Sequence, residues 1–182
     1  MPASQGTLVK VGQMFGNTLL KQMEGVTTLQ AETLISSASR LAGTFMFRSE
    51  SLNVGNAQPG QVVMFPNAEV KAAQLSNLIT VTLQGLGCVL DMNKAKAALD
   101  TSSISSITLL ETQSRFEPLF QAISKTAGLT LIESGTSAAI ASAFLASKRP
   151  YGIDINRAYI VAIYGMHEGL KHVPAPLPDD GQ

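Results

Sequence analysis

The 182-residue sequence predicts an all-α protein, a compact single-domain bundle of about six to seven helices with an irregular loop at 49–66. Apolar residues recur at helical spacing along most of the chain, as in helices that bury one face. Glycine and proline separate these stretches. The single β-like run, 61–65, is too little to build a sheet. At this length one core is the simplest organisation, so we expect one domain over 1–171 and a flexible, proline-rich tail over 172–182.

The first half of the chain predicts three helices. The first is expected over 5–24, where Gly12 and Gly16 lie four residues apart and would let a neighbouring backbone approach closely. The second is expected over 28–48, beginning at a threonine suited to capping. After the loop, a third helix is expected over 68–86.

The next part of the chain predicts a short and a longer helix. Asp91 is placed to cap a helix over 92–99. A fifth helix should follow the Ser/Thr cluster at 101–106 and continue to about Thr126. Pro118 lies inside it, so we expect a kink or a break there.

The last two helices are expected over 130–149 and 155–171. The sixth is rich in small residues, and Asp154 is placed to cap the seventh. Residues 158–166 are uncharged and almost wholly apolar, and a helix that is apolar all round belongs in a core, a membrane or a subunit interface. We therefore expect the seventh helix at the centre of the bundle.

The charge composition argues against several classes of partner. Thirteen basic and thirteen acidic residues give zero formal net charge, whereas nucleic-acid and anionic-lipid binders usually carry a basic surface. Charged residues make up 14% of the chain against a typical ~25%, and zero net charge favours self-association. Cys88 is the single cysteine, which excludes an internal disulfide and fits the cytoplasm.

A membrane-associated protein is a third possibility that the sequence disfavours. The longest stretch without an ionisable side chain, 72–90, is long enough to consider a membrane span. It carries six polar side chains that would be costly against lipid. Lys10 and Lys21 also interrupt the N-terminal apolar run where a signal peptide would need one. We expect a soluble chain.

The sequence contains no catalytic, metal-binding or cofactor-binding motif. His167 and His172 lie five residues apart, about 140° around a helix, whereas the zinc-protease helix needs a spacing of four. Cys88 has no neighbouring base. Phosphate-binding and dinucleotide fingerprints are absent as well. We expect no metal and no cofactor, and an enzyme is the less favoured interpretation.

The leading interpretation is a non-enzymatic protein–protein interaction or assembly protein, a homodimer or a subunit of a larger complex. Small residues on the last two helices would permit close approach of a partner, and the apolar run in the loop either tucks under the bundle or docks on a partner. The candidate interface residues are Ala138, Ala141, Gly165, Gly169, Met64 and Phe65.

The alternative is a small-molecule binder or enzyme with an apolar pocket between helices. Glu32, Arg40, Tyr159 and Tyr164 would then supply the few polar groups that orient a ligand. The competing interpretation of Glu32 and Arg40 is that they are ordinary solvated charges. Whether they turn inward to a cavity or outward to water separates the two.

Overall fold

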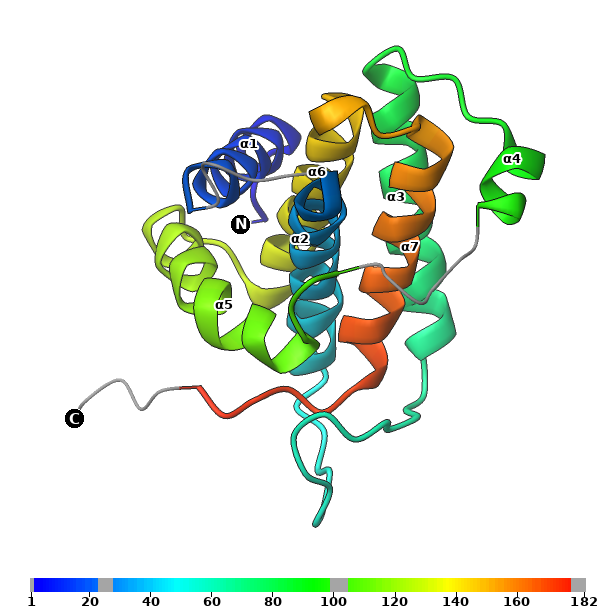
Figure 1. The fold of residues 1–182 in the computed structure, drawn as a ribbon. Helices are drawn as coiled ribbons and strands as arrows, with labels where there is room; N and C mark the ends of the chain where they lie inside the picture. The colour runs from blue at the N-terminus through cyan, green and yellow to red at the C-terminus, as the bar shows by residue number, and fades with distance from the viewer. Residues whose placement is uncertain (1, 23–27, 99–104, 178–182) are drawn as a thin grey trace.

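The computed structural model describes residues 2–22, 28–98 and 105–177, which form α-helices, one short 3-10 helix and no strand (Figure 1). The all-α class and the number of about seven helices are confirmed. The α-helices are α1 (Gln5–Gln22), α2 (Thr28–Ser49), α3 (Ala68–Gly85), α4 (Met92–Ala97), α5 (Leu109–Thr126), α6 (Leu131–Ser147) and α7 (Ile155–Lys171). The 3-10 helix, Pro150–Gly152, precedes α7.

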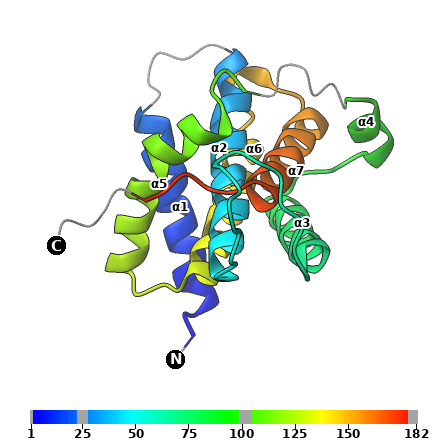
Figure 2. The ribbon, with the colours of Figure 1, turned by 90° about the horizontal axis from the view of Figure 1, so that it is seen from below.

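The centre of the bundle is α2 rather than α7. Every residue from Thr33 to Phe47 is buried, and α6 and α7 pack along this helix. In Figures 1 and 2, α1 and α5 lie on one side of α2, whereas α3 and α7 lie on its other side. By contrast, α7 has a solvent side, because Tyr164 on it is 40% exposed. The apolar run in α7 therefore did not identify the central helix.

Side-chain caps fix where several helices begin. Thr108 and Thr130 start α5 and α6 with capping boxes, in which a glutamate three residues on returns a bond to the backbone. Asp154 caps α7 through the amides of its first turn. The expected break at Pro118 does not occur, since α5 continues through it as one helix.

The loop after α2 lies beside the chain that follows α7. The Val63 amide donates to the Lys171 carbonyl at 2.8 Å, and the Val173 amide donates to the Gln61 carbonyl at 2.9 Å. These bonds form a single antiparallel bridge between Val62 and His172, which holds the start of the expected flexible tail in place. Residues 172–175 are packed on the bundle, with Val173 buried, whereas Pro176 and Leu177 are exposed and 178–182 lie outside the described residues.

In the described part of the chain, no single helix has the length and apolar character to cross a membrane. Taken together, α5 and α6 pass that test by length and composition alone, but they are bent by 116° at their junction.

Candidate functional site

Four of the six expected interface residues lie inside the chain. Ala138 and Ala141 are fully buried on α6. A Cβ at Gly165 would overlap the Ser39 hydroxyl of α2, and one at Gly169 would overlap the Arg40 carbonyl. Close packing at these residues is therefore between helices of one chain, which corrects the expectation that they contact a partner.

The apolar run in the loop divides between core and surface. Phe65 is buried and meets Phe47 edge to face, with ring centroids 5.5 Å apart. Met64 is 66% exposed and Val62 is also exposed. Half of this run therefore tucks under the bundle.

Glu32 and Arg40 are engaged by partners in the chain. Both carboxylate oxygens of Glu32 accept from Arg157, at 2.9 Å each. Arg40 forms an ion pair with Glu168 at 2.7 Å and also donates to the Ile107 carbonyl at 2.8 Å. Glu32 and Arg40 therefore neither point into a ligand cavity nor extend into solvent. Each is largely buried and forms an ion pair within the chain.

Of the two expected ligand-binding tyrosines, Tyr164 lines the same hollow as Glu168, the ion-pair partner of Arg40. Tyr159 is buried, and its hydroxyl oxygen accepts from the Thr80 hydroxyl at 3.3 Å. Tyr164 lines a shallow hollow beside His167 and His172. The structure thus does not bring the four expected ligand residues together.

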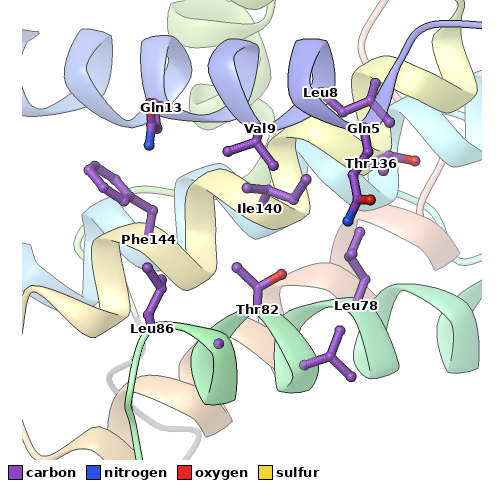
Figure 3. Close-up of a pocket in the computed structure, with 12 residues that line it drawn as sticks. Gln5, Leu8, Val9, Gln13, Leu78, Thr82, Leu86, Thr136, Ile140 and Phe144 are labelled. Carbon is purple, nitrogen blue, oxygen red and sulfur yellow. The ribbon is translucent and has the colours of Figure 1, made fainter.

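A groove of about 330 Å³ lies between α1, α3 and α6 (Figure 3). Its floor is one strip of α6, formed by Thr136, Ile140 and Phe144 at intervals of four residues. The remaining lining residues come from the two walls. One wall is formed by Gln5, Leu8, Val9 and Gln13 on α1, and the other by Leu78, Val81, Thr82 and Gly85 on α3 with Leu86 directly after it.

Gly12 and Gly16 place α1 on this floor. A Cβ at Gly12 would lie 2.8 Å from the Ser137 carbonyl oxygen and 2.9 Å from Cγ2 of Ile140. A Cβ at Gly16 would lie 3.2 Å from the ring of Phe144. The predicted close approach at this glycine pair is confirmed, with α6 as the neighbour.

None of the twelve lining residues carries an ionisable side chain. The Thr136 hydroxyl donates to the Ile132 carbonyl of its own helix, which leaves its oxygen able to accept a further bond. Gln5 and Thr136 lie at one end of the groove and Gln13 at the other (Figure 3). The groove can therefore bind an apolar body and hydrogen-bond its ends, but it offers no acid, base or charge.

A scan against protein-family models, a search of curated proteins and a search of solved structures each return no match to this chain. Function is therefore inferred from its geometry.

Elsewhere the described residues contain no group of three or more metal-ligating side chains. His172 faces the Glu168 carbonyl, with its Nδ1 2.7 Å from the oxygen. Burial, together with the positive charge of Lys171, lowers the pKa of His167 below its ordinary value. His167 lines the same hollow as Glu168, Lys171 and His172.

The groove had one signal in the sequence. The charge-free stretch 72–90 is long enough for a membrane span, and in the fold it supplies one wall of the groove. The wall from α1 and the floor from α6 gave no comparable signal, because the three helices are distant in sequence.

Proposed function

We propose that this chain is a non-enzymatic binding protein that holds a neutral, largely apolar small molecule in the groove between α1, α3 and α6. The supporting observation is a hollow of about 330 Å³ whose lining contains no ionisable side chain. Ligand pockets of this kind are mostly apolar, start at roughly 300 Å³ and carry a few polar groups that set orientation.

The absence of charge in the lining selects the class of ligand. A charged group moved from water into this groove would lose hydration without gaining an ion pair. An uncharged molecule with hydrogen-bonding groups toward its ends would match Gln5 and Thr136 at one end and Gln13 at the other. Ketones, amides, alcohols and esters on an apolar skeleton meet this description.

Native mass spectrometry of the gently purified protein tests the proposal, with a denatured intact-mass control. A reproducible extra mass that disappears on denaturation supports it. A neutral apolar dye whose fluorescence rises in an apolar site provides a second readout. We expect saturable binding of one dye per chain.

A matched pair of variants locates the binding. Val81 lines the groove, whereas Val89 is 84% exposed and outside it. Val81→Lys places a charge in the groove and should weaken dye binding about tenfold or more, while Val89→Lys should leave it unchanged. Equal effects of the two substitutions, or dye binding by neither the parent chain nor the variants, would contradict the proposal.

A second candidate function is self-association, as an interaction or assembly protein. One observation favours it: α3 carries no charged side chain from residue 72 to its end, and Asn77 and Val81 are exposed on this part of the helix. An exposed, uncharged helix face is typical of a surface that a partner covers. The partner we consider is a second copy of the chain, because zero net charge presents no long-range repulsion between copies.

Light scattering coupled to size-exclusion chromatography distinguishes the two candidates. A dimer that Asn77→Lys converts to a monomer would support self-association through α3, since Asn77 is exposed and does not line the groove. A monomer that binds the dye would support the small-molecule function alone. The buried free thiol of Cys88 is consistent with a reducing compartment, and we propose the cytoplasm.

A further inference from the structure

The main chain of Ala175 is held at both of its polar groups. Its amide donates to Gln113 Oε1 at 2.9 Å, and its carbonyl oxygen accepts from Arg48 Nη2 at 2.6 Å. Pro174 and Pro176 on either side have no N–H, so Ala175 supplies the only amide of this tripeptide. Two helices, α2 and α5, thus grip one residue of an extended segment.

Gln113 is buried and Arg48 half-buried, and each is fixed by its own partners. Gln113 is 1% exposed, and its Nε2 donates to the Thr44 hydroxyl at 3.0 Å, which orients the amide. Arg48 is held by both oxygens of Glu117, at 2.6 and 3.0 Å, and Glu117 is 2% exposed. Donor and acceptor are therefore preorganised for the backbone of an extended peptide.

The central side chain of the bound segment is small for its surroundings. A hollow of about 250 Å³ lies beside Ala175, between Gln113, Glu117 and Pro118 on α5 and the last described residues of the tail. Ala175, with a single methyl as its side chain, lines this hollow. A larger apolar side chain between the two prolines would have room there.

We propose that Arg48, Gln113 and Glu117 form a binding site for an extended Pro-X-Pro segment of another protein, in which X is an apolar residue larger than alanine. The chain's own residues 174–176 occupy the site, and the incoming segment displaces them. Proline-flanked segments are extended before they bind and lose little conformational entropy, which suits recognition through a single N–H and C=O pair. This site shares no residue with the groove, so it stands independently of the function proposed above.

The test uses the full chain and a labelled peptide with the sequence of residues 172–177 carrying the change Ala175→Leu. Fluorescence polarisation compares the parent chain with the Ala175→Pro variant, which keeps an extended backbone but removes the amide that Gln113 accepts. We expect about tenfold tighter peptide binding by the variant, because the tail loses one hydrogen bond of its grip. Circular dichroism checks that the helices are retained.

A second peptide, methylated on its central amide nitrogen, is the matched control, since it cannot donate to Gln113. It should bind about tenfold more weakly than the first. Equal affinity of the two peptides, or equal affinity of parent and variant chains, would overturn the proposal.

Hydrogen exchange at the Ala175 amide of the unmodified chain gives a readout that needs no substitution. Saturating peptide should accelerate this exchange, because displacement of the tail exposes the amide to water. Unchanged exchange at saturation would overturn the proposal even if the variant failed to fold.

Discussion

Gly169 of α7 lies directly against the carbonyl oxygen of Arg40 on α2, where a methyl group would overlap the main chain. One turn earlier, Gly165 faces the backbone of Ser36. A Cβ at Gly165 would lie 3.0 Å from the Ser36 carbonyl oxygen. From the other helix, Gly43 faces the Met166 carbonyl. The two helices are therefore in backbone contact along this seam, and the contact fixes α7 on the central helix.

Gly169→Ala should destabilise the fold by about 1–3 kcal/mol or more, because the obstructing atom is backbone and cannot move aside by rotation. Gly85→Ala is the matched control. Gly85 ends α3, no described atom lies within 4 Å of its Cβ position, and alanine should be neutral or stabilising by up to about 1 kcal/mol. Denaturant unfolding measures both. Equal losses for the two variants would show that the seam is not tightly packed.

The helices could be predicted from the sequence because their signals are local. Apolar periodicity and capping residues lie within each helix, and predicted and observed bounds agree closely. The partner of a glycine face is not a local property. Gly165 and Gly169 predict close packing, but their spacing cannot say whether the neighbouring helix belongs to the same chain.

The central position of α2 was hidden by its serines and its arginine. Ser36 and Ser39 donate to backbone carbonyls three residues earlier, at 3.1 Å each, so their hydroxyls are satisfied inside the core. Arg40 is buried because Glu168, from a helix 128 residues away, neutralises it. Polar residues satisfied in these ways look like surface residues in the sequence, and the groove was missed for a similar reason, since its walls meet only in the fold.

Glu117→Gln should cost about 3–5 kcal/mol of stability, because it leaves Arg48 partly buried without its opposite charge. The same substitution at Glu69 is the control. Glu69 pairs with Lys171 at 3.2 Å but is 71% exposed, so Glu69→Gln should cost at most about 1 kcal/mol. Thermal and denaturant unfolding provide the values. A cost for Glu117→Gln as small as that for Glu69→Gln would mean that the Arg48–Glu117 pair contributes little.

The stability of the start of α6 should depend on acid pH through Glu133. Its carboxylate accepts from the amides of Thr130 and Ala3, at 2.8 and 2.6 Å, and these bonds lower its pKa below the ordinary value of 4.5. The charged form is favoured by folding, so this contribution is complete above pH 4.5 and is lost as the pH falls through the lowered pKa.

Unfolding is measured between pH 3 and pH 7, a range that includes the titration of a glutamate carboxyl. The free energy of unfolding should fall less on acidification in Glu133→Gln than in the parent chain. At neutral pH the variant should be the less stable protein, because the charged cap is gone. Parallel pH profiles for the two chains would contradict this assignment. The readout is helix content by circular dichroism together with the unfolding midpoint.

Ser137→Ala should leave stability unchanged or raise it, by about 1–3 kcal/mol at most, because the Ser137 hydroxyl is fully buried and has no hydrogen-bond partner among the described residues. Ser142 on the same helix is equally buried, but its hydroxyl donates to the Ala139 carbonyl at 2.8 Å. Ser142→Ala deletes the same atom and loses that bond, so it should cost about 1 kcal/mol. The difference between the two variants in denaturant unfolding isolates the cost of an unpaired hydroxyl in this core. If Ser137→Ala were the more destabilising of the two, the hydroxyl would have a partner, and a water between α1 and α6 would be the first to look for.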